Sequence, residues 1–235
     1  MRCLKKIGFI SLGMLGFLAL LCSIAASGVV NAHWMEQGFL TYADTAHLSV
    51  PATEYAHYAK AISAYLDGKA ESVSVPSQTD ENLSQLAFSE KENLHMQDVR
   101  GIVNFLKGMR WIGGGLVIAV IAGLYLFSPL EKKSALLTKI LEGFAWGAIM
   151  LLALAASLCI WGAVNFDGLF WFFHQVAFAN DLWLLNPQTD LLMALMPLDF
   201  FIWYAKELLK SLLPVLGMML LLIIAWFKVG KKEAQ

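Results

Sequence analysis

Two histidines in this chain have neighbours that suit them to proton transfer. His95 is followed one helical turn later by Asp98, in the stretch SEKENLHMQDVR. His174 lies in FWFFHQVAFANDLWLLNP, where Asn180 and Asp181 follow it among aromatic and aliphatic residues. An imidazole titrates near neutral pH, and a nearby carboxylate can hold one ring nitrogen while the other is left to act. The two histidines are therefore candidate general acids or bases.

The composition places these histidines in a membrane protein. Of the 235 residues, 58% are hydrophobic and 15% are charged, and the mean hydropathy is +0.62. The apolar residues concentrate in four blocks, each near the ~20 residues that cross ~30 Å of hydrocarbon. We therefore expect an all-α dominated integral membrane protein with four transmembrane helices, a small extracellular cap and interfacial helices.

The expected segments follow from these blocks. We predict transmembrane helices at 1–30, 111–127, 143–165 and 206–227, an extracellular cap at 31–110, a cytoplasmic loop at 128–142, an outer interfacial segment at 166–205 and a cytoplasmic basic tail at 228–235. The first block has the basic start of a signal peptide, MRCLKK. Its apolar run exceeds the ~7–15 residues of an ordinary signal peptide, which favours a retained anchor.

Lysine and arginine set the expected orientation. The short segments 1–6, 128–142 and 228–235 hold nine basic and three acidic residues. The longer intervening segments hold the other eight basic and fifteen acidic residues. Short loops rich in lysine and arginine stay in the cytoplasm. Both termini are therefore expected to be cytoplasmic, with the cap outside.

Two helices are predicted within the cap. Thr53 and Gly68 mark the start and end of the first, in which tyrosines and an isoleucine recur at helical spacing as a packing face. Ser89 and Glu92 form a capping box that predicts a second helix, which carries the first histidine. Gly108 is its expected end.

The outer segment 166–205 is rich in aromatic residues, which concentrate at membrane interfaces. We predict short helices there, one starting at Asn186–Pro187 and another at Pro197 that leads into the last span. Unpaired polar groups are costly at that depth, so His174 and the polar residues after it are functional candidates. The alternative is an interfacial helix whose polar residues face water.

Together the two motifs resemble those of the bacterial lipoprotein intramolecular transacylase (Lit) family. His-Met-Gln-Asp-Val at 95–99 precedes the second span. Phe-His at 173–174, Asn-Asp-Leu-Trp-Leu-Leu-Asn-Pro at 180–187 and Asp190 follow the third. The resemblance covers the chain from the first span to the basic tail. Two positions depart from the family's pattern: Ala177 replaces a bulky aromatic, and Leu198 stands where an acidic residue is typical.

The resemblance implies an acyltransferase of the bacterial cell envelope, a multi-pass protein of the plasma membrane. It would move the sn-2 acyl chain of a diacylglyceryl-cysteine lipoprotein to the α-amino group of the same cysteine, which gives a lyso-lipoprotein. Such lipoproteins and membrane phospholipid are the expected partners, with no nucleic acid, cofactor or metal. The implied catalytic residues are His95 and His174. The expected substrate-binding or supporting residues are Asp98, Arg100, Phe173, Asn180, Asp181, Trp183, Asn186 and Asp190.

Histidine chemistry suits this reaction. An α-amino group has a pKa near ~7.7–8.0, so it must lose a proton before it attacks the ester. One imidazole can take that proton, and a second can protonate the departing glycerol oxygen. The substrate itself supplies both nucleophile and ester, so no protein nucleophile is needed.

Both histidines can act on one substrate only if their rings lie close together. A straight helix through residues 90–127 would lift His95 ~24 Å above the membrane surface, at ~1.5 Å per residue. We therefore predict a bend at Gly108, with Gly101 as the second choice, that folds 90–107 against 166–200. His95 and His174 should then lie within about 10 Å of each other, with aromatic residues between them.

Two other classes of function stay open. A membrane hydrolase would use His95, Asp98, His174 and Asp181 as metal ligands. A non-catalytic receptor or scaffold would use the cap as a binding module. The sequence contains no Walker loop, dinucleotide-binding fingerprint or Cys/His zinc spacing.

Overall fold

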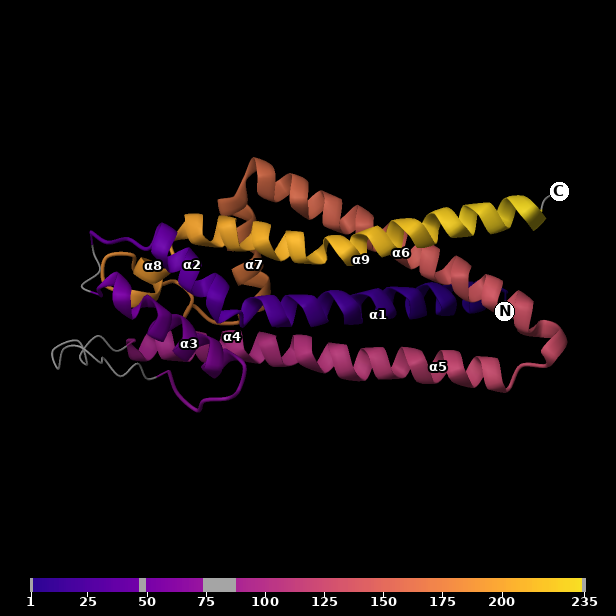
Figure 1. Ribbon diagram of the computed structural model, residues 1–235, viewed down its shortest axis with the longest axis horizontal. Helices are drawn as coiled ribbons and strands as arrows, with labels where there is room; N and C mark the ends of the chain where they lie inside the picture. The colour runs from indigo at the N-terminus through magenta and orange to yellow at the C-terminus, as the bar shows by residue number, and fades with distance from the viewer. Residues whose placement is uncertain (1, 47–49, 74–87, 234–235) are drawn as a thin grey trace. The chain divides into compact units, whose positions relative to one another are not determined.

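The structure, a computed structural model, describes residues 2–46, 50–73 and 88–233. Every regular element within these ranges is helical, and no strand occurs there. Figure 1 labels the helices in chain order. They are α1 (Arg2–Val29), α2 (Ala32–Tyr42), α3 (Tyr55–Leu66), α4 (Glu90–Gly108), α5 (Gly114–Leu126), α6 (Lys133–Val164), α7 (Phe166–Ala177), α8 (Leu191–Leu195) and α9 (Leu198–Glu233).

The chain forms two compact units. The first unit comprises Met1–Ala25, Leu106–Val164 and Ser211–Gln235. The second unit comprises Ala26–Phe105 and Asn165–Lys210. Both histidines of interest belong to the second unit.

Within the described ranges, four helical stretches are long and apolar enough to cross a membrane. They are Leu4–Val29, Glu90–Leu126, Leu130–Val164 and Leu198–Lys228. Each exceeds the ~20 residues that span ~30 Å of hydrocarbon. The predicted helical, multi-pass membrane fold is confirmed.

Glycines allow α1 and α6 to pack backbone against backbone in the first unit. A Cβ added at Gly13 would lie 2.6 Å from the Cα of Phe144. A Cβ added at Gly147 would lie 2.7 Å from the backbone nitrogen of Met14. Gly143, one turn before Gly147, packs against α1 as well. The two α6 glycines thus form a GxxxG pair, a common means of close helix approach in membranes.

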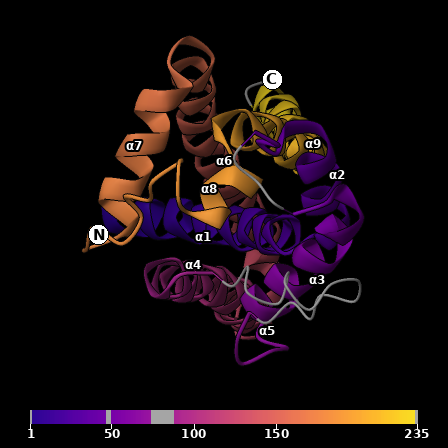
Figure 2. The same ribbon diagram turned by 90° about the vertical axis from the view of Figure 1, so that its left-hand side faces the viewer.

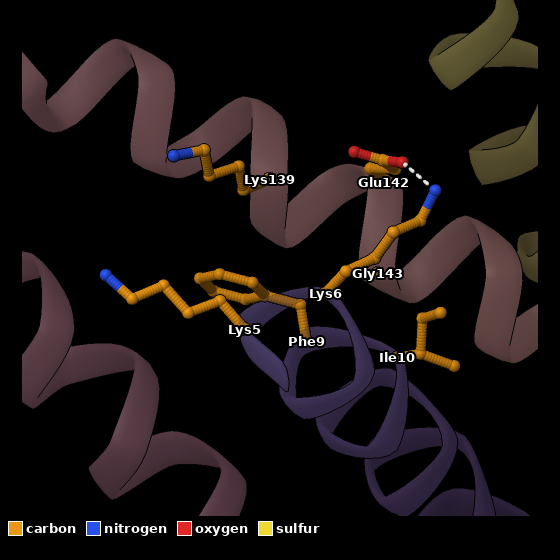
Figure 3. A pocket seen from close by; sticks show the side chains of 7 residues that line it. All are labelled: Lys5, Lys6, Phe9, Ile10, Lys139, Glu142 and Gly143. Carbon is orange, nitrogen blue, oxygen red and sulfur yellow. Dashed lines mark ion pairs between the residues drawn. The ribbon is translucent and has the colours of Figure 1, made fainter. Parts of the chain in front are cut away.

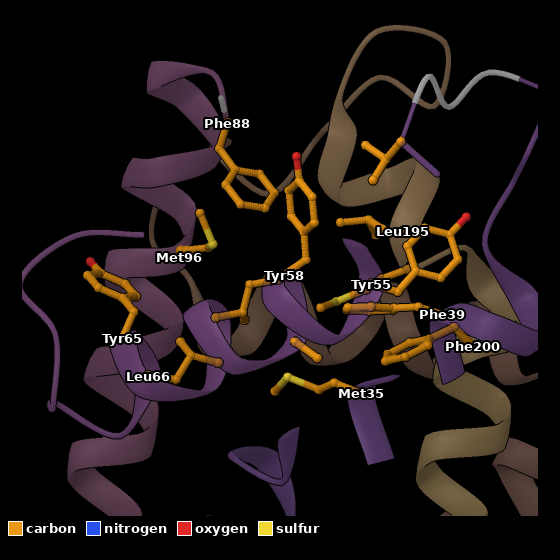
Figure 4. Packing of buried hydrophobic residues seen from close by; sticks show 14 residues of the cluster. Met35, Phe39, Tyr55, Tyr58, Tyr65, Leu66, Phe88, Met96, Leu195 and Phe200 are labelled. Atoms are coloured by element: carbon orange, nitrogen blue, oxygen red, sulfur yellow. The ribbon is translucent and has the colours of Figure 1, made fainter. Parts of the chain in front are cut away.

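The second unit has its own hydrophobic core, shown in Figure 4. The predicted packing face of α3 is buried, since Tyr55, Tyr58 and Tyr65 are at most 8% exposed. Helix α2 packs against α3, as Figure 2 also shows. Met96 of α4 and Leu195 of α8 complete the core. This core joins α4, which carries the first histidine, to the chain that follows the second.

Some of the helix ends predicted from local sequence are confirmed, and one is wrong. The backbone N–H of Ser89 donates to Glu92 Oε2 at 2.7 Å, and the N–H of Glu92 donates to Ser89 Oγ at 3.2 Å, so the capping box is confirmed. Gly68 follows α3 with φ +81°, a conformation that favours glycine. Thr53 is not the N-cap, because Ala52–Glu54 forms a 3₁₀ turn that leads into α3.

Helix α4 ends at Gly108, as predicted, but the backbone angles of Gly108 itself do not show the predicted bend. Gly108 keeps helical angles, φ −60° and ψ −46°, and Gly101 lies inside α4. A π-helical turn, Met109–Gly113, joins α4 to α5. Such a turn takes up one extra residue while the backbone groups stay hydrogen-bonded, which costs less than an open break next to hydrocarbon.

The predicted helix start at Asn186–Pro187 is also wrong. The N–H of Asn186 donates to Asp190 Oδ2 at 2.7 Å, and the N–H of Asp190 donates to the Asn186 carbonyl at 2.9 Å. These bonds close a turn, and the helix begins only at Leu191, with Asp190 as its N-cap. Asp190 takes the N-cap position of α8, and its carboxylate bonds back to Asn186 rather than to the first turn of the helix.

Two further helix starts bear on the predicted segments. The helix expected after Pro197 is present as α9, which starts at Leu198. Helix α6 starts at Lys133, so helical residues occupy part of the loop predicted at 128–142. The membrane boundaries assigned to these segments stay predictions.

The α1–α6 crossing predicts a stability difference between two glycine substitutions. Gly147→Ala should lower the melting temperature in detergent, because its methyl group would meet the α1 backbone, and overpacking costs about 1–3 kcal/mol. Gly123→Ala is the matched control, since nothing lies within 4 Å of a Cβ there. A Gly147→Ala protein as stable as the control would show that the close crossing is absent.

Candidate active site

His95 of α4 and His174 of α7 lie side by side. Their ring centroids are 6.2 Å apart, with 32° between the ring planes. Both are buried, with exposed fractions of 7% and 8%. The predicted proximity of the two histidines, within about 10 Å, is confirmed.

Aromatic side chains from α7 and the following loop surround the pair. The ring centroid of Phe170 lies 4.2 Å from that of His174, and the centroid of Trp183 lies 5.1 Å from it. Phe178 contacts both imidazoles, at 5.1 Å from His95 and 5.5 Å from His174. As predicted, rings from 170–183 line the space around the histidines. They exclude water and so strengthen local electrostatic interactions.

The two imidazoles differ in their hydrogen bonds. His174 Nδ1 lies 2.7 Å from the carbonyl oxygen of Phe170. A carbonyl oxygen only accepts, so Nδ1 carries the proton, and Nε2 bears the lone pair in the neutral ring. His95 Nδ1 is buried and has no hydrogen-bond partner among the described residues. A buried nitrogen without a partner is available to a substrate.

Burial also sets the charge of the second imidazole. The pKa of His174 lies below its ordinary value of 6.5, because burial penalises the imidazolium. The hydrogen bond to the Phe170 carbonyl opposes this shift but is the smaller effect. His174 is thus neutral at physiological pH and ready to accept a proton at Nε2.

A buried carboxylate holds α4 against α8. Glu92 is 1% exposed, and its Oε2 accepts the capping-box bond from Ser89. Its Oε1 accepts a hydrogen bond of 2.6 Å from the backbone N–H of Leu192, in the first turn of α8. Lys91 adds a second link, because its ammonium donates to the Leu184 carbonyl. These contacts position the helical turn that precedes His95.

Asp98 supports the site in a different way from the one predicted. Its Oδ2 accepts a hydrogen bond of 2.9 Å from the side-chain amide of Asn180, rather than from His95. Asn180 Oδ1 accepts the backbone N–H of Leu182 at 3.0 Å, which fixes the amide orientation. The pair therefore ties α4 to the loop after α7, one turn beyond the histidine.

Among the remaining predicted residues, Phe173 and Trp183 lie beside the site. The ring of Phe173 meets His174 edge-on, with centroids 5.3 Å apart. Asp181 is exposed, and its backbone carbonyl accepts the Leu184 N–H in the same loop.

Arg100 and the Asn186–Asp190 pair have other roles. The Arg100 guanidinium lies 4.9 Å from the centroid of the Tyr65 ring and donates to the Ala70 carbonyl at 3.3 Å. It therefore braces α4 against α3, and its prediction as part of the histidine site lacks structural support. Asn186 and Asp190 close the turn before α8.

The metal-ligand alternative finds no cluster in the part of the chain that the structure describes. There, no group of three or more His, Cys, Asp or Glu side chains is arranged to hold a metal ion.

Sequence reasoning missed two contributors to the site. The capping box accounted for one oxygen of Glu92, but nothing local indicated that the other oxygen caps a helix that begins about a hundred residues later. The Phe170 carbonyl, four residues before His174, sets the tautomer. The i, i−4 spacing was visible in the sequence, although it does not show that a ring nitrogen takes that bond.

Comparison with known proteins gives one family. The family model described as lipoprotein intramolecular transacylase Lit matches residues 9–201. No curated protein matched the chain.

Solved structures give the same fold. The chain is similar to the in meso structure of the membrane-integral lipoprotein intramolecular transacylase Lit from Bacillus cereus, at 22% identity and a TM-score of 0.69, over 100% of this chain and 98% of that one. It is also similar to a variant of that protein with one histidine replaced by alanine, at 23% identity and a TM-score of 0.63, over 100% of this chain and 96% of that one. A second variant, in which arginine replaces the histidine, is similar at 23% identity and a TM-score of 0.64, over 100% of this chain and 94% of that one.

The buried carboxylate predicts a stability effect. Glu92→Gln should lower the free energy of unfolding by about 1.5–3 kcal/mol, because an amide replaces one accepting oxygen by a donor that faces a backbone N–H. Glu90→Gln, in the same first turn but exposed, should change it by less than about 1 kcal/mol. Thermal unfolding in detergent measures both. Equal melting temperatures for the two variants would contradict the bridging role of Glu92.

Proposed function

The chain belongs to the lipoprotein intramolecular transacylase family, and from this premise we propose that His95 and His174 carry out its acyl transfer as a proton-moving pair. The observation that carries the proposal is the 6.2 Å separation of the two buried rings. Acyltransferase activity on lipoproteins follows from the family. The residue roles are the proposal.

The proposed reaction moves one acyl group within one substrate. The sn-2 acyl chain of the diacylglyceryl group leaves its glycerol oxygen and joins the α-amino nitrogen of the same N-terminal cysteine. A C–O ester bond breaks, a C–N amide bond forms, and one proton passes from nitrogen to the glycerol oxygen. The product is a lyso-lipoprotein with one ester and one amide, and no co-reactant is consumed.

The ring nitrogens support an assignment of roles. His174 is the base, because its Nδ1 is occupied by the Phe170 carbonyl and its Nε2 is left with a lone pair. It takes the proton that the attacking amine loses. The departing glycerol oxygen needs one proton, and the His174 imidazolium carries it after the amine has been deprotonated. We assign to His95, whose buried Nδ1 has no partner among the described residues, the relay of that proton: one ring nitrogen accepts a proton and the other releases one to the glycerol oxygen. Both rings are neutral before and after the transfer.

The main contribution of the site is conformational. The amine and the ester carbonyl are joined through the cysteine side chain and the glycerol backbone, and their attack closes a ring of medium size that rarely closes unaided. Phe170, Phe178 and Trp183 form walls that favour the folded substrate. Holding two reacting groups in contact is worth ~7–11 kcal/mol in favourable cases.

The charge pattern supports the placement of the protein. The short segments 1–6, 128–142 and 228–235 carry most of their charge as lysine and arginine, which favours the cytoplasm of a bacterial cell. The segments predicted to lie outside, 31–110 and 166–205, carry the two histidines and would then face the side where diacylglyceryl-modified lipoproteins are held. Phospholipid surrounds the four apolar helices.

Removal of either imidazole should slow the reaction. His95→Ala and His174→Ala should each reduce acyl transfer by about 10²–10⁴-fold, the usual contribution of a positioned acid or base. His33→Ala, an exposed histidine of the same unit, is the matched control and should keep full activity. Substrate and product have equal mass, so tandem mass spectrometry must score fragments that carry the acyl chain on nitrogen.

Each variant's melting temperature in detergent checks its folding. Near wild-type turnover in either folded alanine variant would disprove the two-histidine mechanism. Equal loss in His33→Ala would show that the assay reports general damage rather than lost proton transfer.

The lowered pKa of His174 predicts how the protein's stability and the protonation of this residue change with pH. Because the folded pKa lies below 6.5, the unfolded chain binds this proton first as pH falls. The group's contribution to stability is therefore present above pH 6.5 and lost as pH falls through the folded pKa. Carbon-13 NMR of labelled histidine, assigned with His174→Gln, should give a midpoint below 6.5. A midpoint at or above that value would contradict the buried neutral base.

A further inference from the structure

The first unit contains a basic pocket that the acyl transfer does not use. It is partly open, has a volume of about 440 Å³, and lies between the start of α1 and the second and third turns of α6. Lys5, Lys6 and Lys139 line it together with a single acid, Glu142. The pocket therefore has a net positive charge.

The charges within the pocket are divided. Lys6 Nζ lies 3.1 Å from Glu142 Oε1, so these two groups neutralise each other. Figure 3 shows the amino groups of Lys5 and Lys139 on the other side of the Phe9 ring. No ion-pair partner for either occurs among the described residues. The ammonium groups of Lys5 and Lys139 are thus available to an anionic ligand.

The pocket lies where two membrane helices begin. The apolar stretch of α1 starts at Leu4, so Lys5 belongs to its first turn. The stretch that contains α6 is 35 residues long, well beyond the ~20 that fill the hydrocarbon, so its early residue Lys139 fits the headgroup layer. Phe9 and Ile10 provide an apolar floor on the side of the chain that enters the membrane.

The glycine crossing explains why space exists here. Gly143 lines the pocket and also begins the GxxxG pair that presses α6 onto α1. Earlier in both helices, Lys5 and Lys6 of α1 and Lys139 and Glu142 of α6 line the space between them. The crossing and the pocket are thus consecutive parts of one helix pair.

We propose that this pocket binds the phosphate of an anionic glycerophospholipid, with Lys5 and Lys139 on the phosphate and Phe9 and Ile10 against the start of the acyl chains. Basic pockets between transmembrane helices are suited to anionic headgroups. A zwitterionic lipid fits less well, because its own ammonium would be repelled by the same lysines. Inorganic phosphate shares the anion but lacks the apolar part.

The test is native mass spectrometry of the full chain in detergent, titrated with phosphatidylglycerol, phosphatidylcholine or inorganic phosphate. A lysine near an anionic lipid contributes about fivefold in affinity, so Lys5→Gln with Lys139→Gln should weaken phosphatidylglycerol binding by about 30-fold. The matched control, Lys132→Gln with Lys228→Gln, removes the same charge from positions that are exposed like Lys5 and Lys139 but lie outside the pocket. It should weaken binding by less than about threefold. Lys5→Arg with Lys139→Arg keeps both charges and should retain the affinity.

Three results would overturn the proposal. The first is equal loss of phosphatidylglycerol in the pocket variant and the control, which would indicate only general attraction. The second is equal affinity for phosphatidylcholine. The third is inorganic phosphate bound as tightly as the lipid, which would make the site a phosphate site. Acyl transfer by His95 and His174 should continue in all lysine variants, so failure here leaves the proposed reaction testable by itself.

Discussion

The carboxylate of Glu92 decides where His95 lies. A buried carboxylate without donors is strongly unfavourable, so the helices that supply its two N–H groups must stay together. One donor comes from the start of α4 and the other from the start of α8. His95 lies one helical turn after Glu92, so the contacts of Glu92 fix its position. One turn after His95, the hydrogen bond between Asp98 and Asn180 attaches the same part of α4 to the loop after α7.

Much of the second unit could be predicted because its signals act within one or two helical turns. The capping box at Ser89, the positive φ of Gly68 and the tyrosine face of α3 each depend only on neighbouring residues. The approach of the two histidines was predicted differently, from the demand that one substrate reach both rings. That demand gave the correct proximity, whereas the bend that we expected at Gly108 is not seen in the helical backbone angles of that residue.

The remaining features depend on partners that lie far apart in the sequence. The bond from Leu192 to Glu92 joins residues one hundred positions apart, and the bond from Asn180 to Asp98 joins residues 82 apart. No local pattern reports which distant N–H will meet a carboxylate. The helix start misplaced at Asn186 has a local cause instead, because Asn186–Asp190 forms a turn, closed by the bond from the Asn186 N–H to the Asp190 carboxylate, before α8 begins.

The aromatic rings around His174 affect the charged and neutral forms of its imidazole differently. The faces of aromatic rings carry negative potential, and Phe170, Phe178 and Trp183 all have centroids within 6 Å of the imidazole centroid. A neutral imidazole gains little from this potential, whereas an imidazolium is attracted to it. In the proposed reaction, the rings that keep water from the resting site would also attract His174 during the interval in which it carries the substrate's proton, which would offset part of the cost that burial places on the imidazolium.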